Sequence, residues 1–317
     1  MNKVIDLIKK ANSVVILSHD SEDADAVGSS FAMRLALLGM GKDAKCIFSE
    51  IPEERIRFLG DDYTVFDEKD IPKADLCLCL DCGDVQRIGK RKAIFDNAEK
   101  TACIDHHYTN VGFCDADFID SKAPATGEIL YNIFREMGVT ITKDIARQLY
   151  AAISSDTGSF KYSNVRPETF IIASELIKMD IDHAKIARKL FDTESLGVIK
   201  FKGYLMNNME QYFDGKLNIV CAKDSLLKEY GIEEKDTGDI VNIPRSVKGC
   251  EISVSIRETP EKKKISFRSN GKFDVSSLAE KFGGGGHIMA AGAAVKSKSV
   301  ETIKEEVIKY CEEIFNG

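Results

Sequence analysis

The sequence lacks several features, and each absence excludes a class of protein. No apolar run approaches the roughly 18 residues that a membrane-spanning helix needs, so we expect no association with a membrane. The opening segment MNKVIDLIKKANS has the pattern of an amphipathic helix and lacks the apolar core of a secretory signal. Positive charge is not in excess, because 44 Lys and Arg residues face 51 Asp and Glu residues and give a formal charge of −7. This charge argues against binding of long duplex nucleic acid.

The sequence also lacks the cysteine pattern of a disulfide-stabilised secreted protein. Its nine cysteines are odd in number and scattered along 317 residues, so we interpret them as reduced thiols of a cytoplasmic protein. Cys77, Cys79 and Cys82 lie close together in LCLCLDCGD. A zinc or iron–sulfur site needs a fourth nearby ligand and CxxC spacing, so we interpret these three as small apolar residues of a core.

The first half of the chain alternates between strand and helix patterns, which is typical of an α/β protein with a mostly parallel sheet. A continuous apolar run at Asp75–Leu80 predicts a strand that is covered on both faces. Further strands are expected at Val14–Ser18, Ala44–Phe48 and Thr101–Ile104, and helices at Val27–Leu38 and Ala93–Ala98.

After residue 125 the pattern changes to consecutive helices, and the last hundred residues read as a second, smaller α/β unit. A length of 317 residues also favours two domains, at about 150 residues each. We expect an N-terminal domain with a helical layer at 1–190, a linker helix region at 191–210 and a C-terminal domain at 211–317. The helices are expected at 127–137, 143–155, 167–179, 182–190, 195–209, 275–282 and 300–314, and the later strands in KLNIVCA, EISVSIRE and KKISFRS and near 293–295.

Acidic and histidine side chains follow three of the predicted strands. The carboxyl ends of the strands of an open α/β sheet form its ligand site, so these side chains are expected to meet at one edge. Asp156 follows a predicted helix in AAISSDTGSF and is a further candidate. The residues that follow the strands are His19, Asp23, Asp25, Asp81, Asp84, Asp105, His106 and His107.

Carboxylates and imidazoles at this density are unfavourable unless cations are bound. Mixed nitrogen and oxygen ligands favour manganese, with magnesium, iron, cobalt and zinc as alternatives. Six or more ligands are too many for one tetrahedral zinc and suit two divalent ions, roughly 3.5–4 Å apart, which ionise a water and clamp a displacement at phosphorus. Asp23 and Asp25 are two residues apart, so an extended backbone would direct one toward each ion.

These segments resemble, in order, the four motifs of the DHH phosphoesterase family: SHDSEDADAVGSS, LDCGD, DHH and SSDTGSF. The C-terminal SIRE…SFRSNGKFDVSSLAEKFGGGGHIMAAG resembles the DHH-associated domain. The layout is similar to the nanoRNase/pAp-phosphatase subfamily and to stand-alone cyclic-dinucleotide phosphodiesterases. The first motif departs from its commoner form, which has Pro and Gly at the positions of Glu22 and Ala24.

The resemblance implies roles for the individual residues. It places His19, Asp23 and Asp81 on one metal, and Asp25, Asp81, His106 and Asp156 on the other, with Asp81 as the bridge. It places His107 at the scissile phosphate, as a hydrogen-bond donor or as the acid for the leaving oxygen. It makes Asp105 a residue that orients its neighbours. Asp81, Asp105 and His107 are therefore the predicted catalytic residues.

The C-terminal domain carries a predicted substrate clamp. If EISVSIRE and KKISFRS pair with their apolar faces together, Arg257 and Arg268 share the polar face, where guanidinium groups can bind a terminal phosphate. GGGGH follows a helix, so it is not a dinucleotide fingerprint. Its glycines let backbone N–H groups approach a ligand, and His287 is placed to contact a nucleotide. The loop residues of this prediction are Gly284, Gly285, Gly286 and His287.

We therefore predict a manganese-dependent phosphohydrolase of very short nucleotides: short RNA, pApA, cyclic di-AMP or pAp, with 5′-mononucleotide products. A RecJ-type single-strand exonuclease is the alternative enzyme, although such an enzyme would need a longer path of basic residues to bind the strand. A manganese-dependent pyrophosphatase shares the N-terminal motifs but not GGGGH. A nucleotide sensor without catalysis is the alternative of another class. The sequence leaves open whether the chain forms a homodimer.

Overall fold

A computed structural model describes residues 1–238 and 240–316. The chain forms two compact units, Met1–Thr193 (unit 1) and Glu194–Gly317 (unit 2). Among the described residues, no helix has both the length and the apolar character needed to cross a bilayer.

Unit 1, all of whose residues are described, contains a six-stranded parallel sheet with the order β3-β2-β1-β4-β5-β6. This is the order of a doubly wound sheet: β2 and β3 are added on one side of β1, and β4, β5 and β6 are added on the other side, so the strand order reverses between β1 and β4. Ligands of such sheets bind at the carboxyl ends of the strands on either side of that point. The strands are β1 Ser13–Leu17, β2 Asp43–Phe48, β3 Thr64–Val65, β4 Leu76–Leu80, β5 Lys100–Asp105 and β6 Ala116–Ile119.

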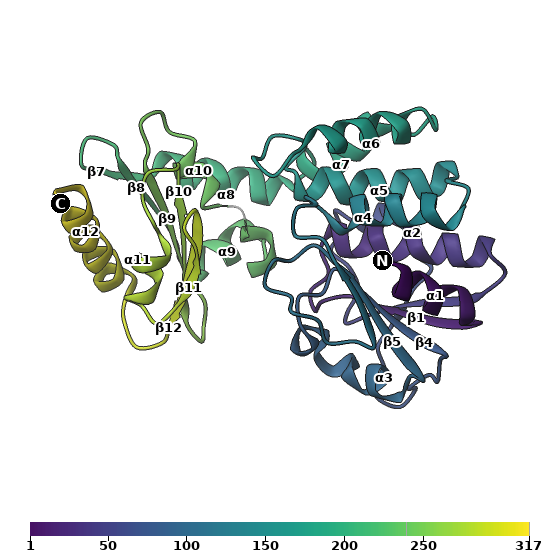
Figure 1. Cartoon of the computed structure of the whole chain (residues 1–317). Coiled ribbons are helices and arrows are strands. Elements are labelled where there is room, and N and C mark those ends of the chain that lie inside the picture. The colour runs from purple at the N-terminus through teal and green to yellow at the C-terminus, as the bar shows by residue number, and fades with distance from the viewer. Residues whose placement is uncertain (239, 317) are drawn as a thin grey trace. The chain divides into compact units, whose positions relative to one another are not determined.

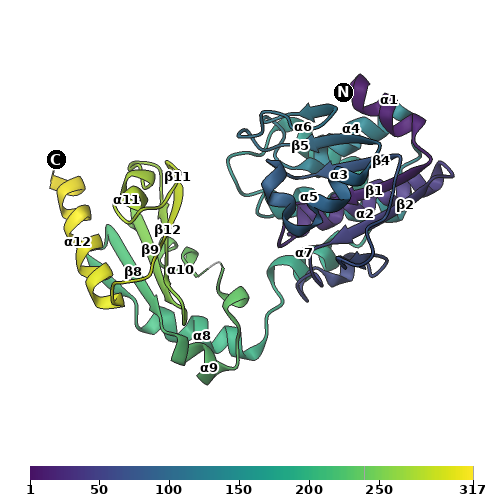
Figure 2. The ribbon, with the colours of Figure 1, turned by 90° about the horizontal axis from the view of Figure 1, so that it is seen from below.

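Helices cover both faces of this sheet (Figure 1). Helices α1, α2, α4 and α5 share one apolar core with one face, while α3 packs with the other face, on the near side of Figure 2. The helices are α1 Asn2–Lys10, α2 Ala24–Gly39, η1 Arg57–Leu59, η2 Val85–Arg91, α3 Lys92–Asn97, α4 Thr126–Met137, α5 Lys143–Asp156, α6 Pro167–Ile177 and α7 His183–Phe191.

Unit 2 contains a mixed sheet, with the order β11-β12-β10-β9-β8-β7 among its described residues. Helices α11 and α12 lie against one face, and α8, α9 and α10 lie on the other side (Figure 1). Its elements are α8 Leu196–Asn207, β7 Glu210–Tyr212, β8 Leu217–Ala222, α9 Asp224–Tyr230, η3 Glu234–Thr237, α10 Asn242–Arg245, β9 Ile252–Glu258, β10 Lys263–Ser269, α11 Ser276–Glu280, β11 Gly285–His287, β12 Ala290–Val295 and α12 Val300–Asn316.

The predicted α/β class and the mostly parallel N-terminal sheet are confirmed. The sequence patterns did not predict the short strands β3, β6 and β7, and the segment interpreted as a glycine loop contains strand β11. Helix α8 lies within the range predicted as a linker, but it packs into unit 2, where Phe201 and Leu205 are buried against Val220.

Small residues allow three helices of unit 1 to approach closely. A Cβ atom on Gly28 of α2 would lie 2.8 Å from the carbonyl oxygen of Gln148, and one on Gly127 of α4 would lie 2.6 Å from the Cβ of Ala152 in α5. Contacts closer than about 3.4 Å between carbon atoms are repulsive. These positions therefore set how closely α2 and α4 approach α5, and with it the distance between Asp25 in α2 and Asp156 in α5.

This packing predicts the effect of one added methyl group. Gly127→Ala should destabilise unit 1 by about 1–3 kcal/mol, because the new Cβ overlaps Ala152 and the core is overpacked. Adding Ala152→Gly to that variant should recover part of the loss, as measured by the denaturant midpoint. Gly39→Ala is the matched control, because a Cβ at Gly39 meets nothing within 4 Å. Equal losses for the two single variants would contradict the overlap.

Candidate metal and catalytic site

The predicted acidic and histidine residues of unit 1 come together at the carboxyl edge of its sheet. His19 and Asp23 lie between β1 and α2, and Asp81 directly follows β4. Asp105 ends β5 and Asp156 ends α5. Asp81 has a φ of +54°, a left-handed conformation that Asp tolerates better than most residues.

The first group of ligand atoms comes from His19, Asp23 and Asp81, which lie within 4.8 Å of one another. His19 Nε2 is 3.7 Å from Asp23 Oδ2 and 3.7 Å from Asp81 Oδ2. His19 Nδ1 lies 2.8 Å from the carbonyl oxygen of Asp20, which can only accept, so Nδ1 carries a proton and Nε2 faces the carboxylates. Asp23 Oδ1 caps α2 by accepting from the backbone N–H groups of Asp25 and Ala26, so Oδ2 is directed to the group.

The second group comes from Asp25, His106 and Asp156. His106 Nε2 is 3.4 Å from Asp156 Oδ2, 3.9 Å from Asp25 Oδ2 and 3.4 Å from Asp81 Oδ1. The two oxygens of Asp81 therefore face different groups: Oδ2 faces His19, and Oδ1 faces His106.

Asp25 is fully buried and is held by the first turn of α4. Its oxygens accept hydrogen bonds from the backbone N–H groups of Thr126 (2.7 Å) and Gly127 (3.0 Å) and from the Ser29 hydroxyl (2.9 Å). The Thr126 hydroxyl also donates to Asp81 Oδ1 at 3.0 Å. The N-terminus of α4 thus places its partial positive charge against both carboxylates.

The site has an excess of negative charge. Within residues 1–193, every ion-pair partner of Asp23, Asp25, Asp81, Asp105 and Asp156 is a histidine. Burial and the neighbouring Asp81 raise the pKa of Asp25 to about 7. Burial and then Asp25 raise the pKa of Asp156 well above its ordinary value.

The histidines respond in the opposite direction. Burial alone would lower the pKa of His106, but Asp81, Asp25 and Asp156 outweigh it and raise the pKa to about 10. Burial is likewise outweighed at His19, where Asp23 and Asp81 raise the pKa to about 9. Such a set of converging carboxylates and imidazoles fits a divalent cation, which would replace the protons that the cluster otherwise gathers.

His107 is oriented by a separate chain of hydrogen bonds. Its Nδ1 lies 2.7 Å from Asp105 Oδ1, and Asn110 Nδ2 donates to Asp105 Oδ2 at 2.8 Å. Burial alone would raise the pKa of Asp105, but the hydrogen bonds from His107 and Asn110 outweigh it and lower the pKa. The ionised carboxylate therefore accepts the Nδ1 proton, and Nε2 of this partly exposed ring remains for a ligand.

In unit 2 the two predicted clamp arginines lie on the same face of the sheet. Arg257 pairs with Lys264 and Arg268 pairs with Ser253, so the two are four residues apart along β9, or roughly 13 Å. Arg257 Nη1 donates to the Thr237 hydroxyl at 3.0 Å. Arg268 instead shares a cross-strand row with Ala290 and His287.

Two of the three predicted loop glycines are required by the close approach of strands. A Cβ on Gly284 would lie 2.1 Å from the Gly292 carbonyl oxygen, and one on Gly286, where φ is +147°, would lie 2.5 Å from the Cα of Ala291. A Cβ on Gly285 would meet nothing within 4 Å. His287 is exposed at the edge of this sheet, one strand beyond Ala290.

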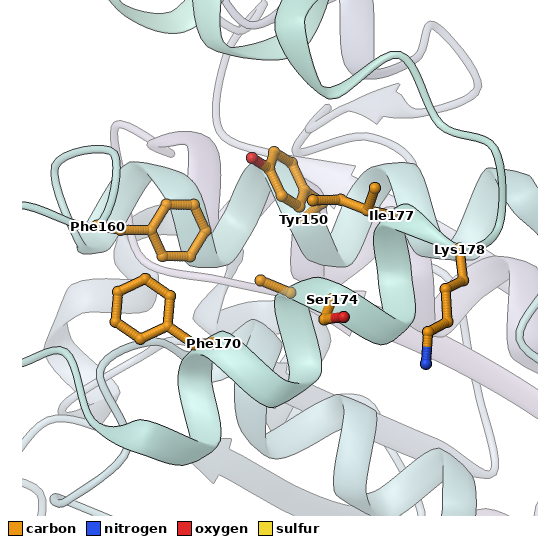
Figure 3. A pocket seen from close by; sticks show the side chains of 7 residues that line it. Tyr150, Phe160, Phe170, Ser174, Ile177 and Lys178 are labelled. Atoms are coloured by element: carbon orange, nitrogen blue, oxygen red, sulfur yellow. The ribbon is translucent and has the colours of Figure 1, made fainter.

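Asp84 and the three clustered cysteines, which the sequence also singled out, contribute to the fold and lie outside the acidic site. Asp84 caps η2 by accepting from the backbone N–H groups of Gln86 and Arg87. Cys77, Cys79 and Cys82 are buried in the core beneath α3. A cavity of about 430 Å³ on α5 and α6 is lined mainly by apolar side chains such as Tyr150, Phe160 and Phe170 (Figure 3), and no residue of the acidic site lines it.

Sequence reasoning missed several residues that hold the site. Thr126, Ser29 and Asn110 bond to the predicted ligands or to Asp105, yet each is a common polar residue. The partner of Thr126 is 45 residues away, and those of Ser29 and Asn110 are four and five residues away. The available signal was weak: Asn110 lies three residues after DHH, and Thr126 lies at the start of a predicted helix. A fourth, Arg91, is fully buried beside the first motif.

Comparison with known proteins defines the class. Residues 13–153 match the DHH family, N-terminal domain, and residues 218–313 match the DHHA1 domain. The chain belongs to the DHH phosphoesterase family and is therefore an enzyme of the phosphodiesterase and phosphatase class.

Particular relatives refine this class. A "bifunctional oligoribonuclease and PAP phosphatase NrnA" from Thermus thermophilus is 31% identical over 313 residues, which cover 98% of this chain and 92% of the relative. The crystal structure of an exopolyphosphatase-related protein from Bacteroides fragilis has a TM-score of 0.91 at 28% identity, covering 100% of this chain and 98% of the other. The exonuclease RecJ bound to manganese shares the fold alone, with a TM-score of 0.57 at 13% identity, over 97% of this chain and 93% of that one.

The orientation of His107 generates a prediction. Asp105→Asn should lower kcat for bis-p-nitrophenyl phosphate by roughly 10²-fold or more, because an amide does not enforce the Nδ1–H tautomer that a carboxylate does. KM and metal binding should change little, since Asp105 bonds to His107 and is itself in none of the groups of ligand atoms. Asp115→Asn is the control, because that exposed carboxylate accepts from Thr101 instead. Wild-type turnover in Asp105→Asn would exclude the orienting role.

Proposed function

We propose that this chain is a manganese-dependent phosphohydrolase that cleaves very short nucleotides to 5′-mononucleotides. The observation that carries the proposal is the position of Asp81. Its two carboxylate oxygens face two different groups of nitrogen and oxygen ligands, 3.7 Å from His19 Nε2 and 3.4 Å from His106 Nε2. A carboxylate in that position suits a bridge between two divalent ions.

We assign the ligands to two sites. His19, Asp23 and Asp81 would hold one ion, and Asp25, Asp81, His106 and Asp156 would hold the other. Two divalent ions, when bound, lower the pKa of a water to near neutrality and offset negative charge on phosphorus. Because Asp23 also caps α2 and Asp25 is bonded to α4, both carboxylates are fixed before any ion binds, which keeps the cost of ordering them low.

The remaining chemistry falls to His107. The Nδ1 proton of this ring is directed to the ionised Asp105, which leaves Nε2 for the substrate. Nε2 then donates a hydrogen bond to a phosphate oxygen, or its proton to the leaving oxygen, at a partly exposed position. Asn110 prevents Asp105 from turning away, because it occupies the second carboxylate oxygen.

The substrate class follows from the relatives and from unit 2. The similar proteins named as oligoribonuclease and PAP phosphatase favour short RNA and pAp, and pApA and cyclic di-AMP share the same phosphoester chemistry. In unit 2, Arg268 and His287 lie on either side of Ala290 in one row, roughly 10 Å apart across two strand spacings. We assign Arg268 to a substrate phosphate and His287 to the nucleotide, with Arg257 as a further phosphate contact.

A single-strand exonuclease of the RecJ type is less favoured. Long single strands need a continuous basic path, whereas this chain carries a formal charge of −7. A non-catalytic sensor would be expected to lack one of the ligands, and all six predicted ligand positions carry Asp or His.

Replacing the bridging carboxylate tests the metal site. Asp81→Ala should reduce turnover by roughly 10³-fold or more, because one group that stabilises a transition state is worth 10²–10³ and Asp81 would serve both ions. Turnover should be followed by product-resolved chromatography on pAp, pApA, cyclic di-AMP and a short RNA ladder with Mn²⁺, and again after chelation. Asp96→Ala, which removes an exposed partner of Lys92, is the control. Turnover that survives chelation would refute the metal-dependent mechanism.

Replacing Arg268 tests the assignment in unit 2. Arg268→Ala should raise KM for pAp and pApA by about 10-fold or more, as expected for loss of a charge-assisted contact, and leave KM for bis-p-nitrophenyl phosphate nearly unchanged. Arg245→Ala is the matched control, because that partly exposed guanidinium bonds to Asn270. An equal rise in KM for all substrates would exclude a specific phosphate contact.

A further inference from the structure

Arg91 is a fully buried arginine at the end of η2, directly beneath the loop that carries the first motif. Its guanidinium donates to two carboxylates: Nη1 to Glu22 Oε1 at 2.6 Å, and Nη2 to Asp20 Oδ1 at 3.1 Å. It also donates to three backbone carbonyl oxygens: those of Ile47 and Ser18, each at 3.0 Å, and, through Nε, that of Ile88 at 3.3 Å. Five acceptors in the fixed fork of one guanidinium, three of them on the loop, specify the position of the loop closely.

The acceptors of Arg91 alternate with the predicted ligands along the loop. Arg91 bonds to Ser18, Asp20 and Glu22, while His19 and Asp23 belong to the first ligand group. Ser18 and Asp20 flank His19 on both sides, and Glu22 directly precedes Asp23. Holding the intervening residues below the loop therefore leaves the two ligands directed at the site.

A chain of contacts connects Arg91 to the imidazole of His19. The Asp20 carbonyl oxygen lies 2.8 Å from His19 Nδ1, and the Asp20 N–H donates to the Arg87 carbonyl oxygen at 2.6 Å. The Asp20 side chain lies directly over Gly89, where φ is +63° and a Cβ would come within 1.8 Å of Asp20 Oδ2. The position of Asp20, which sets the tautomer of His19, is thus fixed by η2.

Glu22 completes the arrangement on the other side. Its carboxylate accepts from Arg91 and from the backbone N–H (2.7 Å) and hydroxyl (2.9 Å) of Ser49, and its side chain is 1% exposed. Both charges are therefore desolvated and fully hydrogen-bonded. A buried ion pair of this kind often adds little net stability compared with apolar residues, so stability alone does not account for it.

We infer that Arg91 is a positioning residue, which fixes His19 and Asp23 for the divalent ion of the first ligand group. The inference rests on the proposed metal site and extends it to a residue that touches no ligand atom of the ion. It predicts that the affinity of one ion depends on Arg91 independently of the stability of the fold. In the second group only Asp25 follows this loop, and its carboxylate is held separately by Ser29 and by the first turn of α4, so the affinity of that ion should depend much less on Arg91.

The test separates the two roles by removing both charges together. In Arg91→Met combined with Glu22→Met, no unpaired charge remains buried, so the melting temperature should stay near that of the wild type. Calorimetric titration with Mn²⁺ should nevertheless show one of two binding events weakened by about 10–100-fold, the range for residues that orient metal ligands. His19→Ala identifies that event, because it should remove the same one. Lys92→Met, at the neighbouring exposed cation, is the control.

The outcomes are distinct. Two binding events of wild-type affinity in a stable double variant would overturn the inference and leave the proposed metal site intact. If the double variant does not fold, Asp20→Ala replaces it, because that side chain is 48% exposed and its loss buries no charge. Asp20→Ala should weaken the same event by about 3-fold or more at unchanged melting temperature. An unchanged affinity there overturns the inference, whereas a wild type that binds no Mn²⁺ overturns the proposed function and this inference with it.

Discussion

Repulsion among carboxylates at the edge of one sheet is the constraint around which unit 1 is arranged. The loop after β1 and the ends of β4, β5 and α5 bring five carboxylates into a small volume, and three of them are almost completely buried. The fold offsets this charge with oriented N–H groups rather than with lysine or arginine. Asp23 caps α2, and Asp25 accepts from the first turn of α4. The partial positive charges at the helix ends weaken the repulsion but do not cancel it. A cation would supply the positive charge that is still missing.

The same hydrogen bonds tie the site to the stability of the fold. Asp25 is at once a predicted ligand and the residue that joins α2 to α4, and the close approach of α5 at Gly127 brings Asp156 to the same place. A cation that binds these carboxylates binds only the folded arrangement, and so stabilises it by mass action. Metal binding and the packing of the three helices are therefore coupled through a few small residues. A single methyl group added at Gly127 would overlap Ala152 and lie 3.5 Å from Asp25 Oδ1, so it can disturb the packing and the site together.

Most of the fold and the predicted ligands could be derived from the sequence, because both depend on local patterns. The apolar run Asp75–Leu80 is followed at once by Asp81, and such patterns locate strand ends without knowledge of the tertiary structure. The short edge strands β3 and β6 escaped, since they are too short to show a period. Thr126 and Arg91 escaped for another reason, because their partners Asp81 and Glu22 are 45 and 69 residues away in sequence. Asn110 is only five residues from Asp105, but nothing in the local pattern marks a polar residue as its partner. In unit 2, the alternation of side chains along the two strands placed Arg257 and Arg268 on one face. Only the pairing register of the strands shows that Arg268 shares a row with His287.

Glu22 shows how a departure from a motif can keep its geometry by other means. The first motif of the family more commonly has proline at this position, and a proline restrains a loop covalently by fixing its own φ and removing an N–H donor. Glutamate has neither property, and leaves the loop free to move unless something else holds it. Here the carboxylate is held by Ser49 and Arg91, and Arg91 reaches past it to Asp20 and Ser18. An ionic network from a neighbouring segment thus restrains the loop in place of a proline ring. As a consequence, the geometry of the first ligand group depends on Arg91, which is 69 positions further along the chain than Glu22.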